Sequence, residues 1–150
     1  MSTRALYEKI LLDHAKNPRN FKVPEKFDVK LEGFNPLCGD QFTFYIVFEG
    51  DVVKSIYFTG NGCAISKASA SILTTLLEGK CKDEAMNIIQ SFMNLMRTPS
   101  NEKVDEEKFG KLAVLAGVRE YPIRIKCATL PWHTVEKILQ GEVSSQVTTE

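Results

Sequence analysis

The residues of this chain best suited to chemistry are its cysteines and one nearby carboxylate. The stretch NPLCGDQF places Cys38 two residues before Asp40, directly ahead of an alternating apolar run, and Cys63 and Cys127 follow in GNGC and RIKCATL. Three thiolates and one carboxylate form a tetrahedral zinc set, and the same donors hold iron in iron–sulfur proteins. Because the thiols are not in CxxC pairs, their spacing leaves buried, inert cysteines as an equal alternative.

Each of these three cysteines lies at the end of a predicted element. Cys38 precedes a strand, while Cys63 and Cys127 each stand directly before a predicted helix. Unpaired N–H groups and the positive dipole end at a helix N-terminus favour thiolate over thiol. Four anionic ligands exceed the charge of one zinc ion, so one thiolate can leave the metal and attack a substrate.

The apolar pattern predicts an α+β fold, with a three-stranded antiparallel sheet packed against helices. Residues 29–58 alternate in the manner of strands, with a turn at Gly50-Asp51. Strands followed by helices place the helices on one face of the sheet. The predicted helices are an amphipathic segment around residues 6–11 ended by NPRN, AISKASASILTTLLEGK, Lys82–Arg97, a short piece around FGKLAVLAG, and ATLPWHTVEKILQG starting near Ala128.

Bulk composition narrows the class of protein. The chain has 150 residues, of which 43% are hydrophobic and 25% charged, and 19 basic residues balance 19 acidic ones. These values predict one domain over residues 1–150, with a flexible tail at 142–150. Without a basic excess, an apolar run of about 20 residues or a signal peptide, we expect neither a nucleic-acid nor a membrane partner. We expect a cytoplasmic protein with reduced thiols.

Four stretches of the sequence resemble the NifU/IscU-type scaffold family of iron–sulfur cluster assembly, and within it the SufU branch. They are DHAKNPRN, NPLCGD, GNGCAISKASAS and YPIRIKCATLPWHT, which occur in the family's order from the first predicted helix to the last. The resemblance implies the compact α+β, SufE/NifU-like fold of that family, with the cysteines gathered at one exposed end.

The resemblance also implies roles for individual residues. Cys38, Asp40, Cys63 and Cys127 fall on the family's metal-ligand positions, which bind zinc in the SufU branch. Such proteins act as sulfurtransferases: Cys38 would accept persulfide sulfur from a PLP-dependent, SufS-like cysteine desulfurase and pass it to downstream iron–sulfur assembly proteins. Two alternatives are a scaffold that itself assembles and transfers an iron–sulfur cluster, as in the IscU branch, and a non-catalytic zinc adaptor.

Three departures from the IscU branch favour the SufU branch. Lys126 stands where IscU-like proteins carry a histidine before the third cysteine, YPIRIK replaces their LPPVK segment, and residues 98–117 form an extra connection. Pro131 would fall in the first turn of a helix beginning near Ala128, where its missing N–H costs little.

Two further residues have competing interpretations. Cys81, among charged residues in EGKCKDEA, matches no family ligand, and we expect a bystander thiol. Arg124, three residues before Cys127, either forms a structural ion pair or contacts the site, where it would steady anionic sulfur or help dock the desulfurase.

Overall fold

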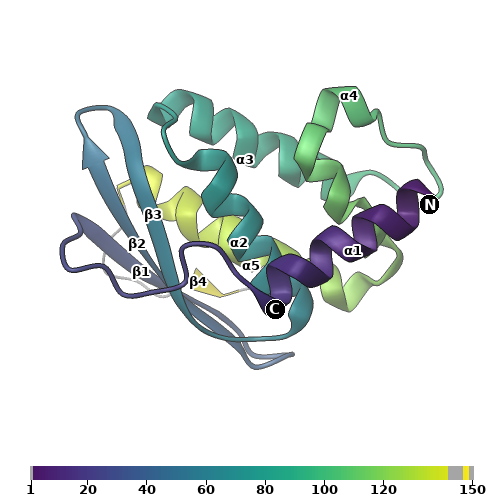
Figure 1. Cartoon of the computed structure of the whole chain (residues 1–150), viewed down its shortest axis with the longest axis horizontal. Helices are drawn as coiled ribbons and strands as arrows, with labels where there is room; N and C mark the ends of the chain where they lie inside the picture. The colour runs from purple at the N-terminus through teal and green to yellow at the C-terminus, as the bar shows by residue number, and fades with distance from the viewer. Residues whose placement is uncertain (1, 142–146, 149–150) are drawn as a thin grey trace.

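The computed structural model describes residues 2–141 and 147–148, and it packs helices against one face of an antiparallel sheet (Figure 1). The elements in chain order are α1 (Thr3–Lys16), β1 (Val29–Asn35), β2 (Asp40–Glu49), β3 (Val52–Asn61), α2 (Ala64–Leu77), α3 (Lys82–Arg97), α4 (Glu106–Phe109), the 3₁₀ segment η1 (Gly110–Glu120), α5 (Pro122–Leu139) and β4 (Val147–Thr148). The predicted α+β architecture is confirmed.

The three long strands form the predicted meander. β2 lies in the centre, antiparallel to both β1 and β3, and Gly50, at φ +61°, begins the tight turn into β3. Val47 pairs with Ser55 and Phe48 with Val53, so Lys54 is the extra residue of a β-bulge. The bulge shifts the alternation of β3, which lets residues on either side of it face the same core.

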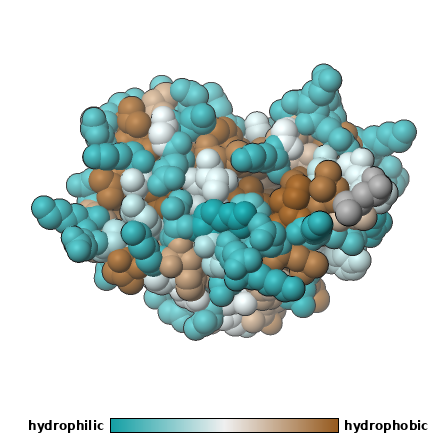
Figure 2. Space-filling view, in the orientation of Figure 1, coloured by the Kyte–Doolittle hydropathy of each residue, from teal (hydrophilic) through white to brown (hydrophobic). Residues whose placement is uncertain are grey.

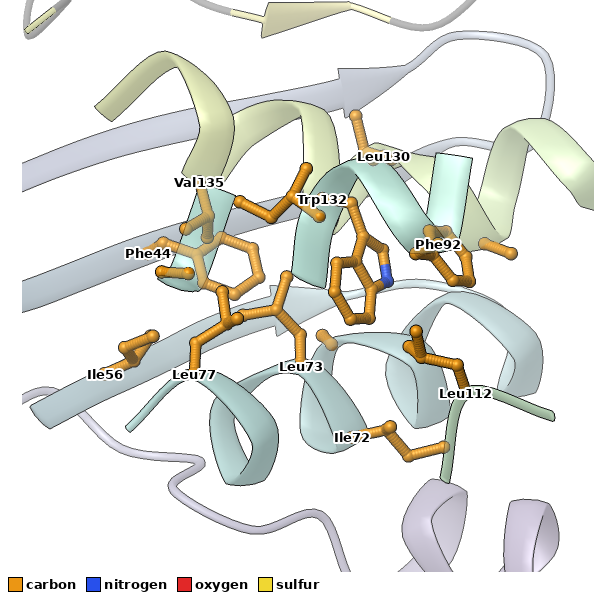
Figure 3. Close-up of a cluster of buried hydrophobic side chains, with 14 of the residues drawn as sticks. Phe44, Ile56, Ile72, Leu73, Leu77, Phe92, Leu112, Leu130, Trp132 and Val135 are labelled. Carbon is orange, nitrogen blue, oxygen red and sulfur yellow. The ribbon is translucent and has the colours of Figure 1, made fainter. Parts of the chain in front are cut away.

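The first layer of helices consists of α2 and α5, which pack against the sheet and against each other. Figure 3 shows how their apolar side chains meet those of the strands: Trp132 of α5 lies beside Leu73 of α2 and Phe92 of α3. The Trp132 and Phe92 rings stack with centroids 4.3 Å apart, and both side chains are fully buried. Small residues in the first half of α2 allow this close approach; they are Ser66, Ala68, Ser69, Ala70 and Ser71, all buried.

The start of α5 differs from the sequence prediction. The helix begins at Pro122, not near Ala128, because a proline at the first helical position has the required φ and lacks only an N–H that would have no partner there. Cys127 therefore lies inside the helix. Pro131 lies in the helix interior as well, where its missing N–H removes the bond that the Cys127 carbonyl would accept. The prediction of Pro131 in the first turn was wrong.

The outer helices α1 and α3, together with η1, cover the first layer. Ser2 caps α1 by accepting the Ala5 N–H at 3.1 Å, and the helix ends at Lys16, just before Pro18, as predicted. Half-buried Tyr7, Ile10 and Leu11 of α1 pack against the core. Figure 2 shows apolar residues gathered near the N-terminus of this helix, between hydrophilic ones.

The end of the chain adds a short parallel strand that the sequence did not reveal. In β4, residues 147 and 148 pair with Gly33 and Phe34 of β1. The rest of the predicted flexible tail, residues 142–146 and 149–150, lies outside the described residues. Among the described residues, no helix has the length and apolar character needed to cross a bilayer.

Candidate metal centre

The hairpin loop between β1 and β2 carries Cys38. Asn35 and Asp40 are paired at its base, and the Gly39 N–H donates to the Asn35 carbonyl at 2.8 Å. Gly39 has a φ of +72°, a left-handed conformation that residues with a Cβ adopt at a cost. The loop is therefore closed by its own backbone, and it holds the half-buried Cys38 beside the first residue of β2.

Asp40 is buried at the start of β2, with one carboxylate oxygen bonded and the other open. Its Oδ1 accepts the Cys63 backbone N–H at 2.8 Å. Its Oδ2 is the one buried side-chain nitrogen or oxygen atom among the described residues that has no hydrogen-bond partner. A Cβ at Gly62 would come within 2.8 Å of Oδ1, so this glycine makes room for the carboxylate. A buried anionic oxygen without a partner is costly unless a cation binds it.

Cys63 is the N-cap of α2, as the sequence predicted for a cysteine placed directly before a helix. Its Sγ accepts the Ser66 N–H at 3.5 Å, and the residue is half-buried. The backbone of Cys63 holds Asp40 while its thiol caps the helix. Both parts of the residue therefore lie at the same end of the molecule as Cys38.

Cys127 lies in the second turn of α5 and is fully buried. Its Sγ is 3.1 Å from the Cys38 Sγ, which is well beyond the roughly 2.05 Å of a disulfide, so both thiols are free. Burial raises the pKa of the Cys127 thiol, and the neighbouring Cys38 and Asp40 raise it further. A metal ion bound at this position would favour the thiolate.

These groups converge on one point. One donor atom each of Cys38, Asp40 and Cys127 lies within 4.8 Å of the other two, a spacing that can hold a metal ion. The Cys63 thiol is outside this trio, although its backbone is bonded to Asp40. Two thiols and one carboxylate, whose Oδ2 has no partner, fit a metal that takes sulfur and oxygen ligands. The site lies at one end of the sheet, where Cys38 is half-buried and Asp40 and Cys127 are fully buried rather than exposed.

Arg124 contacts this cluster from the first turn of α5. Its Nη1 lies 3.9 Å from the Cys38 Sγ and 4.0 Å from the Cys127 Sγ, and the side chain is exposed. The nearby sulfurs, Cys127 first, raise the pKa of its guanidinium. Of the two interpretations left open by the sequence, the site contact agrees with this geometry.

A groove of about 730 Å³ opens beside the cluster, between α1 and η1. Arg124 forms part of its wall, together with Ala64 and Ile65 at the start of α2. The groove therefore reaches the residue that contacts both sulfurs.

The fourth cysteine lies elsewhere. Cys81 caps α3 and bridges to Val52 at the turn end of β3, whereas Asp40 begins β2 at the opposite end of the same strand pair. It is thus separate from the other thiols.

Sequence reasoning missed one residue at the site, Asn35. Its side chain is fully buried, and its Nδ2 donates to the Cys127 Sγ at 3.6 Å. The signal was present in the Asn-Pro dipeptide of NPLC, because asparagine before proline commonly starts a turn by accepting a backbone N–H.

Comparison with known proteins identifies the family of this chain. The family described as the NifU-like N terminal domain matches residues 6–128. The zinc-dependent sulfurtransferase SufU of Bacillus subtilis is 39% identical over 88% of both chains. The iron-sulfur cluster assembly scaffold protein IscU of Streptococcus pyogenes serotype M1 is 34% identical over 97% of this chain and 89% of its own.

Solved structures give the same result. A crystal structure described as a putative iron-sulfur cluster assembly scaffold protein for the SUF system, from Fervidobacterium islandicum AW-1, superposes with a TM-score of 0.80 at 33% identity, covering 92% of this chain and 99% of the other. A NifU-like N-terminal protein from Brucella abortus, at 22% identity and a TM-score of 0.77, shares the fold. The matched segment contains all four residues of the predicted ligand set, and the chain belongs to the NifU-like N-terminal domain family.

Proposed function

We propose that this protein is a zinc-bound sulfur acceptor, which takes persulfide sulfur from a cysteine desulfurase and passes it to iron–sulfur cluster assembly. The observation that carries the proposal is the convergence of Cys38, Asp40 and Cys127, with the buried Asp40 Oδ2 left open. The name of the Bacillus subtilis relative supports both the zinc and the transfer of sulfur. The free thiols suit the cytoplasm, where cysteines stay reduced.

In this proposal Cys38, Asp40, Cys63 and Cys127 hold the metal. We assign the fourth donor to Cys63 because its backbone N–H bonds the Asp40 carboxylate, so the residue lies beside the trio although its thiol is not part of it. Zinc, when bound, would keep the thiols deprotonated at neutral pH and unreactive toward one another.

Cys38 is the residue that accepts sulfur. Among the two thiols in contact, Cys38 is half-buried on a loop, whereas Cys127 is fully buried in a helix. The Cys38 thiolate attacks the outer sulfur of the donor's persulfide. A new S–S bond forms on Cys38, the S–S bond of the donor breaks, and the donor cysteine leaves as a thiolate. The persulfide proton stays on the transferred sulfur, and no net oxidation occurs.

The surface around Cys38 suits a protein partner. Leu37, Tyr121 and Ile123 are exposed large apolar side chains that flank Cys38 and Arg124 in the sequence. Exposed apolar groups gathered around a reactive residue are typical of an interaction site. The groove beside Arg124 extends this surface toward α1. We propose that the desulfurase covers this end of the molecule during transfer.

The test is a persulfide-transfer assay with a SufS-type cysteine desulfurase. Cys38→Ala should abolish sulfur uptake and the stimulation of desulfurase turnover, while its circular dichroism spectrum stays that of the wild type. Cys81→Ala is the matched control, because it also removes a half-buried thiol, but at the other end of the sheet. Persulfide found on the Cys38→Ala protein at the wild-type level would overturn the assignment.

A second candidate function is a scaffold on which an iron–sulfur cluster is assembled and released. It is favoured by the Streptococcus pyogenes relative, which is named as such a scaffold and aligns with 97% of this chain. Anaerobic incubation with ferrous iron and sulfide separates the two. A stable visible chromophore that transfers to an apo-ferredoxin supports the scaffold, and its absence in a protein that retains zinc supports the sulfur acceptor.

A further inference from the structure

The Asn35 side chain contacts both the loop that carries Cys38 and the helix that carries Cys127. Asn35 is the last residue of β1, it pairs directly with Asp40, and it is fully buried. A buried amide needs partners for its oxygen and its nitrogen. Here the oxygen and the nitrogen contact different elements.

The oxygen side of the amide holds the loop that carries Cys38. Oδ1 accepts the Leu37 N–H at 3.1 Å, which closes a turn over Pro36. The nitrogen side faces helix α5, where Nδ2 donates to the Cys127 Sγ at 3.6 Å. The orientation of the amide is fixed, because only oxygen can accept from Leu37, and nitrogen must then face the sulfur.

We propose that Asn35 is the positioning residue of this site, which sets the separation of Cys38 and Cys127 and donates a hydrogen bond to the Cys127 sulfur in the metal-bound state. The inference rests on the proposed function, since it assumes that these two sulfurs are ligands. An N–H donor beside a coordinating sulfur orients that ligand, and such outer partners typically contribute about 10- to 100-fold to metal affinity.

A purely structural role makes a different prediction. If Asn35 serves only to close the loop, its oxygen is sufficient. Asn35→Asp keeps the size of the side chain and the oxygen that Leu37 requires, but it replaces the donor with an acceptor facing the sulfur. Asn35→Ser keeps a hydroxyl that can cap the turn and is too short to reach Cys127. Both variants keep the loop and lose the donor.

The experiment measures zinc affinity of the full chain by competition with a chromophoric chelator, together with the thiolate-to-metal absorption of the cobalt(II)-substituted protein. For Asn35→Asp and Asn35→Ser, we expect zinc affinity to fall about 10- to 100-fold and the cobalt absorption to change in position or intensity. Thr134→Val is the matched control, because it also removes a buried hydrogen bond from the Cys127 helix, Oγ1 to the Leu130 carbonyl, without contacting sulfur. Its zinc affinity should equal that of the wild type.

The possible outcomes separate the inference from the proposed function. Zinc affinity within twofold of wild type and an unchanged cobalt spectrum in either folded Asn35 variant would overturn the positioning role. Failure of the wild-type protein itself to bind zinc would instead overturn the proposed function. If Asn35→Asp does not fold, Asn35→Ser, which introduces no charge, decides the question.

Discussion

Two regions of helix α5 differ in whether the buried polar groups around them have hydrogen-bond partners. Around Trp132, the buried polar groups have partners: the indole Nε1–H donates to the Ser69 Oγ at 2.9 Å, and that hydroxyl donates to the Ala128 carbonyl at 2.6 Å. Around Cys127, five residues earlier, two thiols lie in contact and the Asp40 Oδ2 has no partner. Trp132, Cys127 and Asp40 are all fully buried, so solvent exposure does not explain the difference.

The comparison shows how one helix serves stability and function. In the core, Ser69 joins α2 to α5 and satisfies a carbonyl close to the point where Pro131 interrupts the helix. At the site, the Asp40 Oδ2 has no hydrogen-bond partner and is available as a metal ligand. Packing around Trp132 stabilises the position of α5. This stability offsets the free-energy cost of the unpartnered Asp40 carboxylate oxygen until a metal binds.

The largest effect should come from the core. Trp132→Ala removes the most voluminous fully buried side chain and its stacking on Phe92, so it should lower the free energy of unfolding by about 3–5 kcal/mol. Urea unfolding of the metal-free protein measures this loss. A loss below about 1 kcal/mol would mean that Trp132 does not anchor α5.

A smaller loss is expected when the polar link in the core is cut. Ser69→Ala removes the hydroxyl that bonds both the Trp132 indole N–H and the Ala128 carbonyl. It should lower the free energy of unfolding by about 1–3 kcal/mol. The same unfolding measurement applies, with Thr75→Val as the control, because Thr75 also bonds a carbonyl of α2 but is only half-buried. Equal losses in the two variants would contradict the link.

At the site, we expect one substitution to affect metal-free stability and zinc affinity differently. Asp40→Asn keeps the acceptor for the Cys63 N–H and removes the buried charge, so the metal-free protein should be as stable as wild type or more stable. Its zinc affinity should fall by at least about tenfold, since a ligand oxygen is lost. Unfolding with and without zinc measures both. If Asp40→Asn lowers metal-free stability and keeps wild-type zinc affinity, Asp40 serves stability and not metal binding.

The smallest effect concerns pH. His14 Nδ1 lies 2.8 Å from the Ser71 Oγ, which already accepts the Arg19 N–H at 2.8 Å, and burial, followed by the charge of Arg19, lowers the pKa of His14. The folded state therefore binds the proton less readily than the unfolded state. The contribution of His14 is present above about pH 6.5 and is lost as pH falls through its lowered pKa.

Urea unfolding of the metal-free protein at pH 7.5 and 5.5 tests this sign. Wild type should lose more stability between these two pH values than His14→Gln does. Parallel losses in the two proteins would show that His14 does not contribute.

The sequence predicted the three long strands because their signals are local, and it brought forward candidate ligands of which the fold places Cys38, Asp40 and Cys127 together. Alternating apolar residues define β2, the Gly50 turn defines the hairpin, and the thiols are conspicuous in any loop. The start of α5 was missed because YPIRIK resembles an extended segment, and only packing shows that Pro122 begins the helix. The Asn-Pro dipeptide indicated the turn that Asn35 closes, but no local pattern reports its contact with Cys127, 92 residues away, or the bond between Ser69 and Trp132, 63 residues apart.

The most direct test of the account is zinc-edge X-ray absorption of protein purified without chelator, combined with metal analysis. We expect one zinc per chain with three sulfurs at about 2.3 Å and one oxygen at about 2.0–2.2 Å. A sulfur count of three that falls to two in both Cys63→Ser and Cys127→Ser would assign the ligands. A wild-type site with two sulfurs or fewer, or a chain purified without stoichiometric metal, would contradict the claim that Cys38, Asp40, Cys63 and Cys127 share one ion.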